Sequence, residues 1–161
     1  MLKVVVNSTP LIVLCNIGML SLLKEMYGEI IIPEAVYKEI TAKMDSACIA
    51  VNQSMDWIKI LKIPANEKLK IYRARLHAGE VEVMLLAQQL PVADLVIIDD
   101  NAAKTTAKFL GLKVTGTLGV LLKAKKLGLI SSIRPLIEKI VQSGFYISDN
   151  IKNIILHSAG E

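Results

Sequence analysis

Leu95-Val96-Ile97-Ile98-Asp99-Asp100-Asn101 changes character within a few residues. An apolar, partly β-branched run stops at two adjacent carboxylates, and a helical pattern begins at Asn101. This order predicts a buried strand that delivers acids to the edge of a sheet, where the sites of open α/β sheets form. Adjacent carboxylates repel each other unless a positive partner such as a divalent metal ion lies beside them. The structural alternative is that Asp caps the following helix.

Strand patterns and helix patterns alternate along the rest of the chain as well. Short apolar runs at 4–6, 29–32, 57–60 and 113–115 predict further strands, the third of them at a sheet edge. Helical patterns are predicted at 10–19, 20–26, 33–40, onward to about 54, 68–75, 81–90, 101–110, 117–126, 132–143 and 148–157. Strands that alternate with helices predict an α/β fold with a mostly parallel sheet. The 161 residues suit one domain, 1–161, with the helices from about 131 packed on it.

The composition narrows the class of protein. Apolar residues make up 53% of the chain and aromatic residues only 4%, so the core is expected to be aliphatic. No apolar run reaches the roughly 20 residues that span a bilayer, and we expect a cytoplasmic protein without a membrane partner. The net charge of +4 permits an acidic partner such as RNA without requiring one. The apolar surplus suggests an oligomer, with 20–26 or 83–90 as an interface or, alternatively, as core.

Cysteine and histidine offer no recognisable site. Cys15 and Cys48 lie in apolar helical patterns, as small buried side chains do. His77 and His157 lack the clustered spacing of metal ligands. Zinc and disulfide chemistry are therefore not predicted.

Three further segments carry acids or amides to positions near those strand ends. Asn7 ends the first strand, Glu39 lies in the helix after the second, and Glu80 opens the apolar helix. Each has an ordinary alternative: a turn amide for Asn7, an ion pair with Lys43 for Glu39, and a first-turn acid for Glu80. Glu82 sits inside an apolar run, which predicts burial and hence a partner.

The combined pattern resembles the PIN-domain family over nearly the full length. The resemblance rests on 5–12 (VVNSTPLI), 32–40 (IPEAVYKEI), 79–82 (GEVE) and 98–103 (IDDNAA). The continuation 116–122 (GTLGVLL) is similar to the VapC-like toxin ribonuclease branch. This resemblance implies a three-layer α/β/α sandwich, a metal-dependent endoribonuclease and the toxin of a toxin–antitoxin pair.

The same resemblance implies the site residues. The family's acids fall on Asn7, Glu39, Glu80 and either Asp99 or Asp100, with Glu82 as a further ligand. Oxygen ligands of this kind favour Mg²⁺ or Mn²⁺. Asn7 replaces the acid usual in the family, which lowers the negative charge of the site. An Asp100→Ala or Glu39→Ala change is expected to abolish cleavage.

Four residues are predicted to contact RNA or to orient ligands. Ser8 or Thr9 could orient a ligand or a water molecule, and Lys104 could contact a phosphate or instead pair with Asp100. Thr117, at a helix start, could donate to a phosphate or merely cap its helix. An RNA substrate, a small antitoxin and a second copy in a homodimer are the partners that the resemblance suggests.

Two other functions remain open at this point. A degenerate module that binds RNA or an antitoxin without cleavage is favoured by Asn7. A Mg²⁺-binding phosphoacceptor domain also gathers acids at strand ends, but those domains resemble a pattern with the acid pair after the first strand. Here Asn7 occupies the early position and the pair follows a later strand.

Overall fold

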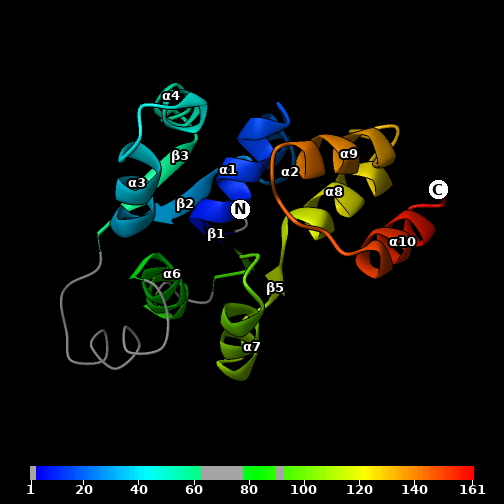
Figure 1. The fold of residues 1–161 in the computed structure, drawn as a ribbon. Helices are drawn as coiled ribbons and strands as arrows, with labels where there is room; N and C mark the ends of the chain where they lie inside the picture. The colour runs from blue at the N-terminus through cyan, green and yellow to red at the C-terminus, as the bar shows by residue number, and fades with distance from the viewer. Residues whose placement is uncertain (1–2, 63–77, 90–92) are drawn as a thin grey trace.

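A single parallel sheet organises the computed structural model, which describes residues 3–62, 78–89 and 93–161 (Figure 1). Its described strands run in the spatial order β3-β2-β1-β4-β5, and all neighbouring strands are parallel. Their bounds are β1 Val4–Val6, β2 Ile30–Pro33, β3 Ile58–Leu61, β4 Leu95–Ile97 and β5 Val114–Thr115. The predicted α/β class, the parallel sheet and the edge position of β3 are confirmed.

Helices cover both faces of this sheet in a three-layer α/β/α arrangement. In Figure 1, α6 and α7 lie below the strands, whereas α1, α4, α8 and α9 lie above them. The described helices are α1 Ser8–Asn16, α2 Ser21–Tyr27, α3 Glu34–Thr41, α4 Ser46–Asn52, α6 Ala78–Gln89, α7 Asn101–Phe109, α8 Thr117–Lys126, α9 Arg134–Gln142 and α10 Asp149–Ser158. The helix predicted at 68–75 lies outside the described residues.

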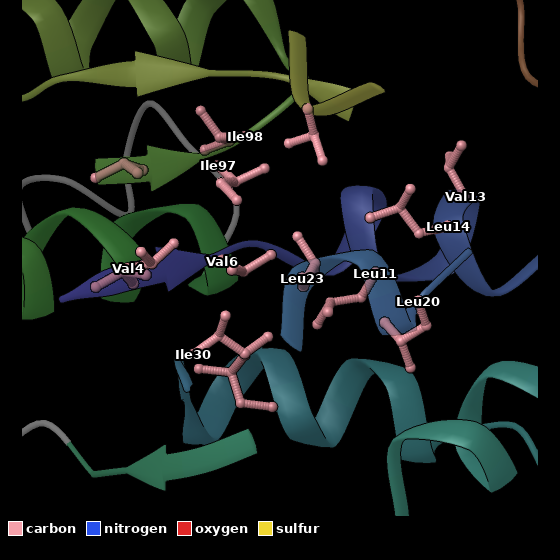
Figure 2. Packing of buried hydrophobic residues seen from close by; sticks show 14 of the residues in the cluster. Val4, Val6, Leu11, Val13, Leu14, Leu20, Leu23, Ile30, Ile97 and Ile98 are labelled. Atoms are coloured by element: carbon pink, nitrogen blue, oxygen red, sulfur yellow. The ribbon is translucent and has the colours of Figure 1, made fainter. Parts of the chain in front are cut away.

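The core is aliphatic, as the composition predicts. All three residues of β1 are fully buried, because the strand is central and is covered on both faces. Figure 2 shows Val6, Leu11, Leu23 and Ile97 from separate elements packed together. Burying one such side chain stabilises the fold by about 1.5–3 kcal/mol.

Two local predictions need correction. The helical stretch expected to continue to about residue 54 is interrupted after Thr41, and α4 restarts with Asp45 as its N-cap, whose side chain accepts from the Cys48 backbone N–H at 3.0 Å. Asp45 satisfies a free N–H of the new helix, as capping residues do. The sequence also favours Ser8 or Thr9 as the N-cap of the first helix, with Pro10 in its first turn, but the N-cap of α1 is Asn7.

The two apolar segments considered as an interface belong to the core. Leu22 and Leu23 of α2 are buried, and so is the run from Val83 to Ala87 in α6. The alternative of core packing is therefore correct for both segments. Among the described helices, no single one is long and apolar enough to cross a bilayer, although α1 and α2 pass that test as a pair bent by 117°.

Candidate active site

The carboxyl ends of the parallel strands bring polar residues to one edge of the sheet. Asn7 follows β1, Asp99 and Asp100 follow β4, and Thr117 follows β5. Strands β1 and β4 are direct neighbours, with Val6 opposite Ile97. The Asn7 backbone N–H continues this ladder and donates to the Ile97 carbonyl at 2.9 Å. Segments that are far apart in the sequence therefore meet where sites of parallel sheets form.

Asn7 carries an unsatisfied acceptor into this edge. Its side chain is only 4% exposed, and Oδ1 has no hydrogen-bond partner within the described part of the chain. A buried acceptor without a partner costs about 1–3 kcal/mol, and such groups call for an explanation such as an ion. The amide oxygen is thus available to a ligand of positive character.

Glu39 comes to the same region from α3. Ser8 Oγ donates to Glu39 Oε2 at 2.9 Å and so joins the start of α1 to α3. The Glu39 carboxylate lies so close to Gly79 in the first turn of α6 that a Cβ there would overlap it. Among the described residues Glu39 forms no ion pair with Lys43, so the surface pairing considered above does not occur.

Glu80 and Glu82 project from the first turns of α6. Each is 9% exposed, and each has interactions with other groups. The Ala35 backbone N–H donates to Glu82 Oε1 at 3.3 Å, which links α6 to the start of α3. The prediction that Glu82 is buried and has a partner is confirmed.

The adjacent Asp99 and Asp100 have different roles in the structure. Thr117 binds both oxygens of Asp99: its backbone N–H donates to Oδ1 at 2.7 Å and its hydroxyl to Oδ2 at 2.6 Å. Asp100 instead caps α7, because its Oδ2 accepts from the Ala103 N–H at 2.8 Å. Asp99 therefore faces β5 and α8, while the carboxylate of Asp100 satisfies a helix terminus.

Gly116 leaves space that the side chains of Asp99 and Lys104 approach. A Cβ at Gly116 would lie 2.7 Å from Asp99 Oδ1 and 2.8 Å from Lys104 Nζ. The ammonium group of Lys104 and the carboxylate of Asp99 therefore both lie next to Gly116, and among the described residues Lys104 makes no ion pair with Asp100. Gly79 and Gly116 belong to the motifs 79–82 and 116–122 quoted above, but the sequence does not predict their close approach to these charged side chains.

The donor set fits a hard cation such as Mg²⁺ or Mn²⁺. The oxygen atoms come from Asn7, Glu39 and Asp99, with Glu80 and Glu82 on the neighbouring helix, and oxygen ligands are the ones these ions prefer. Within the described residues, no three His, Cys, Asp or Glu side chains already surround one point where an ion could lie. The observation that favours a bound ion is the buried Asn7 Oδ1 atom, which has no hydrogen-bond partner among the described residues.

Other reactive groups lie outside this arrangement. Burial, aided by the negative charge of Asp45, raises the pKa of the Cys15 thiol to about 11. Cys15 is therefore a neutral thiol near neutral pH and a poor nucleophile. Thr9 is half-buried, and His157 is exposed on α10; His77 lies outside the described residues.

Comparison with known proteins agrees with this geometry. A family model described as a PIN domain matches residues 3–161. A search of curated proteins finds no significant match. Because the family match spans nearly the whole chain, and the parallel sheet places Asn7, Glu39 and Asp99 near its carboxyl edge, this protein belongs to the PIN-domain family.

Proposed function

We propose that the protein is a metal-dependent endoribonuclease that hydrolyses RNA phosphodiester bonds. PIN domains are typically metal-dependent nucleases that bind nucleic acid. The observation that carries the proposal is the buried Asn7 Oδ1, which has no hydrogen-bond partner among the described residues. It lies at the sheet edge where Asp99 follows β4, next to the Ser8–Glu39 hydrogen bond. Such an arrangement offers several oxygen donors, the ligand type that Mg²⁺ and Mn²⁺ prefer.

The residues that would hold Mg²⁺ or Mn²⁺ are Asn7, Glu39, Glu80, Glu82 and Asp99. When bound, such an ion activates water and stabilises the negative charge of the pentacovalent transition state. Asp100 stabilises the start of α7 as its N-cap, and its carboxylate adds negative charge next to Asp99. The order of importance that we propose places Asp99 before Asp100, because Asp99 is half-buried and lines the pocket at this edge, whereas Asp100 is exposed and caps α7.

Neighbouring side chains orient the ligands and the substrate. Ser8 holds Glu39 with its hydroxyl, and Thr117 holds Asp99 with its hydroxyl and backbone N–H. The roles proposed for them are therefore positional. Lys104 brings positive charge beside Asp99, where a substrate phosphate would be attracted. Thr9 is proposed to face bound water or RNA next to Ser8.

Cleavage of a mixed RNA pool tests this function. We expect wild-type protein to cut in Mn²⁺ or Mg²⁺ and not in EDTA, and Asp99→Asn or Glu39→Gln to lower the rate at least about 100-fold. Glu138→Gln is the matched control, because Glu138 is exposed on α9, away from this edge. Cleavage that persists in EDTA, or in both site variants, would refute the proposal.

A non-cleaving PIN module is the second candidate function. Asn7 favours it, since an amide supplies an oxygen ligand without negative charge. Such a module would bind RNA or an antitoxin through the same edge. Calorimetry decides between the two: Mn²⁺ binding that is lost in Asp99→Asn supports the nuclease, and RNA binding without any metal binding supports the module.

We further propose that the chain acts as one domain, as the toxin of a toxin–antitoxin pair, and as a homodimer. Exposed apolar side chains offer surface for such partners, among them Met44, Phe109 and Ile154. Light scattering on the purified protein measures the dimer directly. A small protein that co-purifies with the chain and suppresses its cleavage would support the toxin assignment.

A further inference from the structure

A pocket of about 510 Å³ adjoins the candidate active site. One wall comes from α7, β5 and the start of α8, and includes Asp99. The opposite wall comes from the segment between α9 and α10 and from α10 itself. Figure 1 shows this linking segment passing the N-terminal end of α8 on its way to α10. The pocket therefore begins at a proposed metal ligand and extends away from it.

Two lysines give one side of the pocket a positive charge. Lys104 and Lys108 both line it, and they lie one turn apart on the same face of α7. Neither makes an ion pair of 4.0 Å or less with another described residue. Two unpaired ammonium groups one helical turn apart suit the phosphate backbone of a nucleic acid.

The opposite wall is apolar and aromatic. Tyr146 lines the pocket on this side together with Phe145 and Ile155, and Leu118 at the start of α8 adds an apolar side chain from the first wall. Phe145 is partly buried and packs on the core, whereas the Tyr146 side chain is 84% exposed. An exposed tyrosine ring in a pocket that two lysines also line suits the stacking of an unpaired base.

We propose that this pocket binds the nucleotide of single-stranded RNA that flanks the scissile phosphate. Lys104 and Lys108 contact its phosphates, and its base stacks on Tyr146 against the apolar wall. The inference rests on the proposed nuclease function and extends it to the residues that hold the nucleotide beside the cleaved bond. A base inside a duplex cannot reach the ring, so the pocket selects unpaired RNA.

Fluorescence anisotropy with a short, unstructured, labelled oligoribonucleotide tests the pocket without cleavage, in EDTA and again in Ca²⁺. We expect Tyr146→Ala to weaken binding about fivefold or more, and Tyr146→Phe to bind within about twofold of wild type, because the ring persists. Lys108→Ala should weaken binding. It should also reduce, by about one, the slope of the logarithm of the binding constant against the logarithm of the salt concentration. An RNA duplex of the same sequence should bind equally to wild type and Tyr146→Ala.

Two matched controls separate the pocket from general surface effects. Phe109→Ala removes an aromatic ring that is 88% exposed but does not line the pocket, and Lys139→Ala removes an exposed lysine on α9. Both controls should bind RNA within about twofold of wild type. Equal losses in controls and pocket variants would overturn the pocket as the binding site.

The outcomes also distinguish this proposal from the nuclease function. If the protein does not cut RNA, but Tyr146→Ala and Lys108→Ala still weaken single-strand binding selectively, the nuclease fails and the pocket stands. If the protein cuts RNA while both variants bind like wild type, the pocket is refuted and the nuclease stands. If wild-type protein binds no single-stranded RNA, the pocket is also refuted as an RNA site.

Discussion

Thr117 holds both oxygens of the Asp99 carboxylate, through its backbone N–H at 2.7 Å and its hydroxyl at 2.6 Å. Thr117 is only 1% exposed, so these bonds are shielded from competing water. The bonds tie the end of β4 to the first turn of α8 across the adjacent strand β5. Asp99 consequently has a fixed orientation before any ligand arrives, which is the preorganisation that a metal or phosphate site needs.

Replacing Thr117 by Val should weaken both the fold and the site. Valine keeps the shape but removes the hydroxyl donor, and a hydrogen bond to a charged group contributes about 1.5–3 kcal/mol. We expect the free energy of unfolding in urea to fall by at least about 1.5 kcal/mol. Thr105→Val is the control, because the Thr105 hydroxyl only bonds the Asn101 carbonyl on the exposed face of α7. Equal losses in both variants would contradict the role given to Thr117.

Variants of Asp100 should separate its charge from its capping bond. Asn caps a helix about as well as Asp, whereas Ala does not. Asp100→Asn should therefore keep the stability of α7 and most RNA cleavage, while Asp100→Ala should lose about 1 kcal/mol of unfolding free energy. Thermal melting and a cleavage assay on both variants measure this. If Asp100→Asn is as inactive as Asp99→Asn, Asp100 is a ligand and not only a cap.

Gly79→Ala should lower activity without lowering stability. A Cβ at position 79 would overlap the Glu39 carboxylate, and Glu39 can move away because it is the end of a flexible side chain. Alanine also favours the helix by up to about 1 kcal/mol over glycine. We expect an unchanged or raised melting temperature and roughly tenfold slower cleavage. In a Glu39→Gln background the same change should have no further effect on cleavage, since both act on one group.

Local patterns predict most elements of this fold. The apolar run before Asp99 and the polar start at Asn101 are sufficient to predict β4 and α7, because strand burial and helix capping depend on neighbouring residues. Helix α8 has the predicted bounds of Thr117 and Lys126. The interruption between α3 and α4 was missed, because Asp45 within a polar stretch was not identified as a cap.

The pairings within the site depend on the order of strands, which local patterns do not specify. Ser8 meets Glu39 across 31 residues of sequence, and Thr117 meets Asp99 across 18. The sequence left Asp99 and Asp100 equivalent, since both follow the strand, and only the packing of α8 gives them different partners. The PIN-domain resemblance predicted the candidate residues, and their roles as ligands stay predictions.

Asn7→Asp should strengthen metal binding. The change adds a negative charge where a buried oxygen has no hydrogen-bond partner in the part of the chain that the structure describes, and the affinity of a metal site rises with ligand charge. We expect calorimetry to show roughly tenfold tighter Mn²⁺ binding than wild type. The variant should melt at a lower temperature in EDTA, because its carboxylate is buried, and recover in Mn²⁺. Asn153→Asp, on the exposed face of α10, should leave both quantities unchanged. No gain in affinity would place the metal elsewhere.

Glu161 should make stability depend on pH in the acid range. Hydrogen bonds from the Ser132 hydroxyl, the Ile133 N–H and Lys125 lower the pKa of Glu161 from 4.5 to about 2. Since the folded protein holds the ionised form, its contribution is complete above pH 4.5 and is lost as the pH falls towards 2.

The measurement is the melting temperature of wild type and Glu161→Gln between pH 7 and pH 2. The Ser132 and Lys125 bonds join this residue to the α8–α9 region, so the variant should melt lower than wild type near neutral pH. The difference should shrink as the pH falls below 4.5. Glu138→Gln, exposed on α9, should follow wild type throughout. A difference that stays constant down to pH 2 would show that the ionised carboxylate of Glu161 does not stabilise the fold.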